Sequence, residues 1–101
     1  MISRSPYRIF GEKVKRAQQI PILDVAAHFG YGPFEKYRLH ELKGRCPFHS
    51  SYYPATIYLN TWKNVWWCEA CGGGNSITLY QVNAGRHFKE AVLEMLEVFD
   101  V

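Results

Sequence analysis

The sequence has no run approaching the roughly 20 consecutive apolar residues that a transmembrane helix needs. The N-terminal stretch MISRSPYRIF likewise lacks the apolar segment of a secretory signal peptide. These absences lead us to expect a cytoplasmic protein with no membrane partner. No internal repeat, low-complexity segment or linker divides the chain, so the sequence predicts a single domain over residues 1–101.

Cysteine is scarce, with only Cys46, Cys68 and Cys71 in the chain. An odd number of cysteines in a reducing compartment argues against a disulfide framework and favours metal binding or catalysis. A chain of this length buries only about two thirds of the surface that it exposes when unfolded. A bound metal would therefore add usefully to its stability.

Acidic residues are few in the first two thirds of the chain. Residues 1–67 carry ten Lys and Arg against four Asp and Glu, a net charge of +6, whereas residues 68–101 carry two against five, a net charge of −3. A basic region beside an acidic one is typical of a protein that presents one face to a polyanion. A solvated charge distribution without a partner gives the same pattern.

Two types of periodicity predict an α+β domain, with a small antiparallel sheet flanked by short helices. Apolar residues at helical spacing predict one helix from Pro21 to Gly30 and two more over 75–85 and 88–99, the first of these two capped by Asn75 or Ser76.

Short β-branched and aromatic runs predict the strands. The runs ATIYLN and NVWWC flank the turn TWKN and indicate a hairpin over 55–68. A second pair of strands is expected within 36–46, turning near Gly44. Alternation along ATIYLN places Ile57 and Leu59 on one face and Thr56, Tyr58 and Asn60 on the other.

The cysteines belong to two pairs of metal-ligand type. Cys46-x-x-His49 is followed, after eighteen residues, by Cys68-x-x-Cys71, and four such ligands fit a closed tetrahedral zinc site. Their order differs from that of a helix-bearing finger and indicates a zinc ribbon. Three thiolates and an imidazole leave no open position on the metal, so the zinc is expected to be structural and a thiol or zinc hydrolase is disfavoured.

The motifs CPFH, YPATIYL, CEACG and FKEAVLEML, in this order, resemble the N-terminal CHC-type zinc-binding domain of bacterial DnaG-type DNA primases. The likeness extends forward to VKRAQQIPILDVAAHFG and covers Val14 to Phe99. It implies a zinc ribbon in which Cys46, His49, Cys68 and Cys71 hold one structural Zn²⁺.

The resemblance also implies a function in DNA replication, as the module that grips single-stranded template for primer initiation. Its expected partners are single-stranded DNA, a catalytic primase domain in cis or in trans, and a replicative helicase or polymerase. Because the carboxylate-rich polymerising domain is absent, we expect no enzymatic activity from this chain alone. It would be a piece of a larger primase or a free-standing protein of a phage, plasmid or mobile element.

The sequence departs from the family pattern at two places. After the histidine, SSYYPATI keeps the family's proline but replaces its charged residues with tyrosines. Before the third ligand, Trp66 and Trp67 stand where the family often has an aromatic residue followed by histidine. Both departures fall where contacts to DNA are expected.

Single strands are held by basic side chains on phosphates and by aromatic faces that stack on bases. The predicted sheet offers both types of residue, and Trp62 and Trp66 are expected to be exposed. The predicted nucleic-acid contacts are Arg38, Lys43, Arg45, Tyr58, Trp62, Lys63 and Trp66, with Tyr52 and Tyr53 as further candidate platforms. The alternative is that about half of the aromatic residues belong to the core.

A second function class remains open. Zinc ribbons also dock proteins, and the predicted last helix carries Glu90, Glu94 and Glu97. The chain could therefore be an adaptor that binds a replication or mobile-element partner through this acidic surface.

Overall fold

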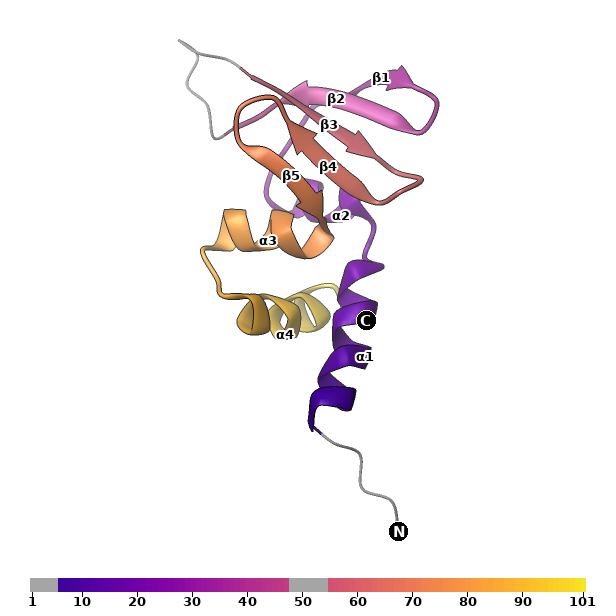
Figure 1. The fold of residues 1–101 in the computed structure, drawn as a ribbon. Helices are drawn as coiled ribbons and strands as arrows, with labels where there is room; N and C mark the ends of the chain where they lie inside the picture. The colour runs from indigo at the N-terminus through magenta and orange to yellow at the C-terminus, as the bar shows by residue number, and fades with distance from the viewer. Residues whose placement is uncertain (1–5, 48–54) are drawn as a thin grey trace.

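The computed structural model describes residues 6–47 and 55–101, which form four helices and one five-stranded sheet (Figure 1). The elements in chain order are α1 (Pro6–Gln18), α2 (Ile22–His28), β1 (Glu35–Arg38), β2 (Glu41–Arg45), β3 (Thr56–Asn60), β4 (Val65–Cys68), β5 (Gly72–Asn75), α3 (Ser76–Ala84) and α4 (Phe88–Val98). The strands follow one another across the sheet in sequence order, and every neighbouring pair is antiparallel. The predicted α+β class is confirmed.

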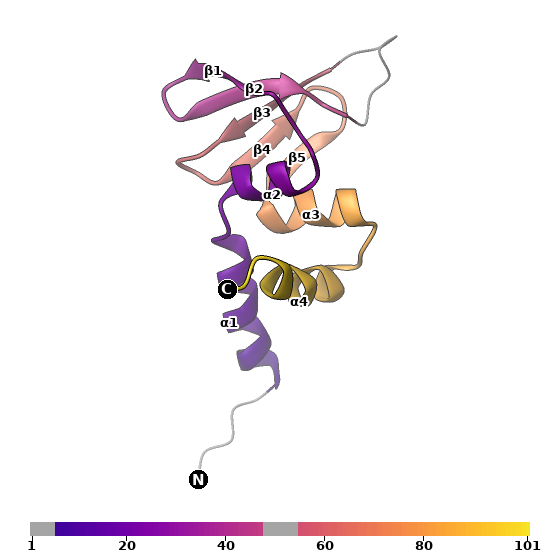
Figure 2. The same cartoon turned by 180° about the vertical axis from the view of Figure 1, so that it is seen from behind.

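All four helices lie on one side of the sheet (Figures 1 and 2). Helices α2 and α3 contact the strands, α4 packs against α3, and α1 lies beside α4, away from the sheet. The core fills the space between the sheet and these helices, and its fully buried side chains include Ile22, Ile57, Leu59, Ile77 and Met95. Within residues 6–47 and 55–101, no helix lies on the opposite face of the sheet.

The ends of α3 follow from its sequence. The side chain of Asn75 accepts a hydrogen bond from the backbone nitrogen of Thr78 at 3.1 Å, which satisfies one of the free N–H groups at a helix start. At the other end, Gly85 adopts a left-handed conformation with φ of 66°, and its nitrogen donates to the carbonyl of Gln81. Of the two predicted caps, Asn75 and Ser76, the observed one is Asn75, and the predicted stop near Gly85 is confirmed.

The hairpin before the zinc ligands differs from the prediction. The chain turns at Leu39 and His40, where His40 takes a φ of 66°, and Gly44 lies inside β2. Gly44 is needed there because a Cβ at this position would stand 2.8 Å from the ring of Phe34. The glycine marks a close packing contact, and the predicted turn near it is wrong.

Two further elements differ from the prediction. The resemblance from Val14 onward implied the family's first helices and so covers only the end of α1, which begins at Pro6, and a proline in the first turn of a helix is a common start signal. The glycines of 72–74, which have the composition of a loop, form most of β5. Gly74 pairs with Trp66 in the sheet, and only a glycine fits there because a Cβ would clash with the side chain of Thr78. In the part of the chain that the structure describes, no helix combines the length and apolar character that crossing a bilayer requires.

Candidate metal centre and nucleic-acid interface

The three cysteines meet at one end of the sheet. Cys46 follows directly after β2, Cys68 ends β4, and Cys71 lies in the turn before β5. Their sulfur atoms all lie within 4.8 Å of one another, with Cys46 and Cys68 buried and Cys71 exposed. The antiparallel register explains this meeting, because β2 and β4 run parallel to each other on either side of β3 and end at the same edge.

The spacing of the sulfurs fits a tetrahedral zinc. The Sγ atoms of Cys46 and Cys71 lie 3.8 Å apart, far beyond the ~2.05 Å of a disulfide. Two thiolates bound at about 2.3 Å to one tetrahedral Zn²⁺ are separated by about 3.8 Å. The cysteines are therefore already placed as three corners of a zinc site.

Charge also favours a cation at this position. Partial desolvation of the sulfur, reinforced by its hydrogen bonds with the neighbouring sulfurs of Cys68 and Cys46, raises the pKa of Cys71 to about 12, although the residue is exposed. Thiolates this close repel one another, and a divalent metal is what holds several of them deprotonated together. The predicted fourth ligand, His49, lies outside the described residues.

A residue that sequence reasoning missed lies beside this centre. Tyr31 is buried, and its hydroxyl accepts a hydrogen bond from the side chain of Asn83 at 3.1 Å. Burial, with a smaller contribution from the three cysteines, raises the pKa of Tyr31 to about 12. The tyrosine thus connects α3 to the surroundings of the sulfurs, and no local sequence signal pointed to it.

Strand alternation separates the side chains of the sheet into two sets. The face away from the helices, which we call the outer face, carries Glu41, Lys43 and Arg45 of β2, Thr56, Tyr58 and Asn60 of β3, and Val65 and Trp67 of β4. The inner face carries Ile57, Leu59, Trp66 and Cys68, all of them buried. The predicted alternation along β3 is confirmed.

Three aromatic rings form a row across the outer face. The ring of Tyr58 lies between those of Tyr37 and Trp67, at centroid distances of 5.2 and 5.8 Å. Trp67 is 53% exposed and Tyr37 is 40% exposed. We call these three residues the aromatic row. Sequence reasoning named only Tyr58 of the three, because the register that aligns β1, β3 and β4 is not visible in the sequence.

The predicted exposure of Trp66 is wrong. Trp66 pairs with Leu59, so its side chain points into the core and is 4% exposed. Its indole nitrogen donates to the carbonyl of Asn75 and to the hydroxyl of Thr78, both at 3.1 Å. Trp66 is a structural residue, and its neighbour Trp67 occupies the exposed position.

Two of the predicted contacts lie at the far end of the sheet from the cysteines. Trp62 and Lys63 belong to the turn between β3 and β4, and Trp62 is 76% exposed, as expected. The ring of His40, in the turn between β1 and β2, lies 5.1 Å from that of Trp62. The two turns are joined by a hydrogen bond from the nitrogen of Thr61 to the carbonyl of His40.

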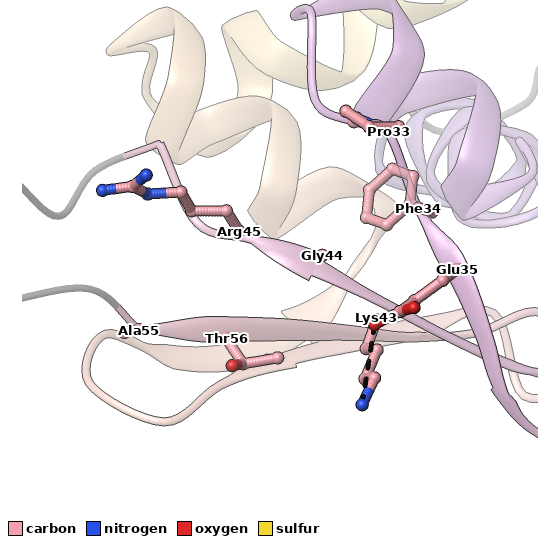
Figure 3. Close-up of a pocket in the computed structure, with 9 residues that line it drawn as sticks. Pro33, Phe34, Glu35, Lys43, Gly44, Arg45, Ala55 and Thr56 are labelled. Carbon is pink, nitrogen blue, oxygen red and sulfur yellow. Dashed lines mark ion pairs between the residues drawn. The ribbon is translucent and has the colours of Figure 1, made fainter. Parts of the chain in front are cut away.

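Cations surround one end of the aromatic row. The guanidinium carbon of Arg38 lies 4.8 Å from the ring centre of Tyr37, and the ammonium of Lys43 lies 5.3 Å from the same centre. Lys43 also forms an exposed ion pair with Glu35 at 3.6 Å. Figure 3 shows the Lys43–Glu35 pair on one side of β2 and Phe34 on the other, with the guanidinium of Arg45 extending away from the strand. Lys43 and Arg45 both line an open hollow at this edge of the sheet.

The net positive charge of the chain is not concentrated on the sheet. Arg38, Lys43 and Arg45 are accompanied by three carboxylates, Glu35, Glu41 and Glu69. Residues 1–18 hold five Lys and Arg against one Glu, so most of the basic excess lies N-terminal to the sheet. The outer face therefore presents charges of both signs around its aromatic rings.

Comparison with known proteins identifies the fold. Residues 15–101 match the family described as CHC2 zinc finger, the zinc ribbon of DnaG. The chain is similar to the Aquifex aeolicus primase in a crystal structure of its zinc-binding and RNA polymerase domains, with 26% identity and a TM-score of 0.69. That match covers 87% of this chain and 21% of the Aquifex chain, so this chain spans about a fifth of it. No curated protein sequence matches.

The comparisons agree with the geometry of the sulfurs. A CHC2 zinc finger and a cluster of three cysteines at zinc spacing together support one structural zinc in this fold. With its zinc-ribbon architecture and a family match over most of its length, the chain belongs to the CHC2 zinc finger family of DnaG-type primases.

Proposed function

We propose that the protein is the template-binding zinc module of a primase or primase-like replication protein, and that it grips single-stranded DNA for primer initiation. The zinc is held by Cys46, His49, Cys68 and Cys71. The observation that carries the proposal is the aromatic row, with cations at its side, on the face of the sheet that none of the described helices covers.

The aromatic row and its cations supply what a single strand requires. Bases stack on exposed rings, and each stack contributes about 1–3 kcal/mol. Arg38 and Lys43 stand beside the ring of Tyr37, and Arg45 lies at the end of β2; these cations reach phosphates of the same strand. The ion pair of Lys43 with Glu35 is exposed, and such pairs are weak enough for the lysine to exchange partners.

The zinc contributes by fixing strand ends. Cys46 adjoins Arg45, and Cys68 adjoins Trp67, so the metal holds in register the two strands that carry a phosphate contact and a stacking platform. Its role is structural, because a site with three thiolates and an imidazole has no open position for catalysis.

Primer synthesis would need a catalytic domain on the same or another polypeptide. The Aquifex primase crystal structure holds a zinc-binding domain together with an RNA polymerase domain, and we propose an equivalent partner here. A replicative helicase or polymerase is a further proposed partner.

The test is a titration of the zinc-loaded protein with single-stranded and then duplex DNA at two salt concentrations, followed by tryptophan fluorescence. We expect single strands to quench the fluorescence, with an affinity that falls as salt rises. The double variant Lys43→Ala, Arg45→Ala should weaken binding and reduce the salt slope by about 1.4, the value for two phosphate contacts on a single strand.

The matched control is Lys13→Ala with Lys89→Ala, which removes the same charge from α1 and α4, on the other side of the molecule. An equal loss of affinity in the control would mean that net charge, not the outer face, governs binding. Absence of any response to single strands, with zinc bound, would overturn the proposal.

A second candidate is the protein-docking adaptor. The outward side of α4 exposes Leu93 between Glu90 and Glu97, an apolar contact flanked by carboxylates. Glu94 is engaged inside the domain by Tyr80 and Arg86, which leaves Glu90 and Glu97 as the acids available to a basic partner. Capture of a catalytic primase domain that is abolished by Leu93→Ser and unaffected by nuclease would favour this function.

A further inference from the structure

The outer face contains a hollow with an unusual lining for a surface that binds a polyanion. Three rings and two carboxylates surround it, from Tyr37, Glu41, Tyr58, Trp67 and Glu69. Its volume is about 510 Å³, which is enough for one nucleobase. The aromatic row forms its floor and the glutamates stand beside the rings.

One of the carboxylates is held in place. The hydroxyl of Tyr58 donates to Oε1 of Glu69 at 3.4 Å, and the backbone nitrogen of Glu69 donates to the carbonyl of Thr56 at 3.3 Å. Glu69 is thus positioned beside the central ring of the row. Glu41 reaches the same hollow from β2, where it pairs with Asn60 and is half-buried.

Carboxylates at this place oppose phosphate binding, because like charges raise the free energy of the complex. Cations stand within reach of the same rings, so the glutamates are not part of a surface that is acidic throughout. Their useful role in a nucleic-acid site is to accept hydrogen bonds from donors on a base.

The four bases differ in what they offer to a carboxylate. Guanine presents two adjacent donors, N1–H and the N2 amino group, on its Watson–Crick edge, and these match the two oxygens of one carboxylate. Adenine and cytosine place one amino group beside an acceptor nitrogen, and thymine places acceptors on both sides of its single N–H. A carboxylate facing this edge therefore favours guanine and repels the acceptors of the other three.

We infer that this hollow is a guanine-selective subsite, in which the base stacks on Trp67 and turns its Watson–Crick edge toward Glu69, while Glu41 lines the opposite side of the hollow. The inference rests on the proposed function, since it names the base that the template-binding face selects. The remaining strand is held by stacking and by phosphate contacts, which do not distinguish bases.

The experiment compares oligothymidine strands that differ only at one central base, with binding followed by fluorescence anisotropy of an end label. We expect the strand with central guanine to bind about 5- to 150-fold more tightly than the others, the range for one bidentate side chain–base contact. In Glu41→Gln with Glu69→Gln, this preference should disappear while affinity for plain oligothymidine is kept or raised. Glu90→Gln with Glu97→Gln removes the same charge from α4 and should retain the preference.

The remaining outcomes separate this inference from the proposed function. Equal binding of all four strands by the unaltered protein would overturn the guanine subsite and leave the template-binding function standing. No binding of any strand would overturn both. Binding of a short arginine-rich peptide that is lost in the Glu41, Glu69 variant, without a guanine preference, would reassign the hollow to a cationic side chain of a partner protein.

Discussion

The side-chain oxygen of Asn64 accepts a hydrogen bond from the backbone nitrogen of Ile22 at 2.7 Å. The amide nitrogen of the same side chain donates to the carbonyls of Gln18 and Ile20, at 2.8 and 2.9 Å, and to the hydroxyl of Ser76. One residue of the turn between β3 and β4 thus joins the segment between α1 and α2 to the start of α3. The contact fixes the sheet relative to the helices.

Replacing Asn64 should therefore destabilise the whole domain. In Asn64→Ala the nitrogen of Ile22 and the carbonyl of Gln18 lose the hydrogen bonds from this side chain, while the carbonyl of Ile20 keeps the one from Ser76. Alanine also tolerates the φ of 59° poorly. We expect the free energy of unfolding to fall by about 3 kcal/mol, measured by urea denaturation of the zinc-loaded protein. Asn64→Gly removes the same hydrogen bonds but accepts a positive φ. It should be less damaging, and a glycine variant as stable as the unaltered protein would contradict this role.

The stability of the domain should depend on pH through Glu94. The hydroxyl of Tyr80 donates to Oε1 of Glu94 at 2.6 Å and Nε of Arg86 donates to Oε2 at 3.0 Å. The hydrogen bond from Tyr80, with a smaller contribution from Arg86, holds the pKa of Glu94 below its usual value. A lowered folded-state pKa stabilises the protein above the pKa of an unfolded glutamate, about 4.3, and this contribution is lost as pH falls through the folded value.

The measurement is the Tm of the unaltered protein and of Glu94→Gln, followed from neutral pH down through the folded-state pKa of Glu94. The unaltered protein should have the higher Tm at neutral pH, and the difference should shrink as the solution becomes acidic. Tyr80→Phe should show a weaker pH dependence of the same sign. A difference in Tm that stays constant with pH would mean that Glu94 acts through packing instead.

Local signals in the sequence predicted several features correctly. The two ligand pairs indicated the metal, the alternation in β3 indicated its buried face, and Asn75 and Gly85 marked the ends of α3. Each of these depends on residues close together in the chain. The sequence could not show which tryptophan of Trp66 and Trp67 is buried, because that depends on pairing with β3.

Contacts between distant segments were also hidden. Asn64 looked like an ordinary turn residue, and its partners in 18–22 and at Ser76 are brought to it only by the fold. Gly44 was mistaken for a turn because the ring that packs on it, Phe34, reaches it from the segment before β1. Glu41 and Glu69, the carboxylates of the hollow beside the aromatic row, come from β2 and from the turn after β4.

Removal of zinc should unfold the sheet. The metal holds the ends of β2 and β4 and the start of β5, and structural zinc in small domains contributes about 10–16 kcal/mol of apparent binding free energy. We expect a chelator to abolish the sheet contribution to the circular dichroism spectrum, and added Zn²⁺, unlike Mg²⁺, to restore it. Cys46→Ser should lose metal and fold together, whereas a spectrum unchanged after zinc removal would contradict the structural role.

The two adjacent tryptophans should respond to substitution in opposite ways. Trp67 is exposed in the aromatic row, so Trp67→Ala should weaken single-strand binding by about 1–3 kcal/mol with little change in Tm. Trp66 is buried, and Trp66→Phe deletes an indole N–H that has two acceptors. That variant should lose about 1 kcal/mol of stability and bind DNA with unchanged affinity.

The affinity for single strands and the Tm should both be measured for Trp67→Ala and for Trp66→Phe. Trp62→Ala serves as the third variant, because Trp62 is exposed at the far end of the sheet beside His40. A loss of affinity in Trp67→Ala and Trp62→Ala would mean that a strand runs along the sheet to the second turn. A loss in Trp67→Ala alone would confine stacking to the aromatic row. If Trp66→Phe lost affinity while Trp67→Ala kept it, the outer face could not be the binding surface.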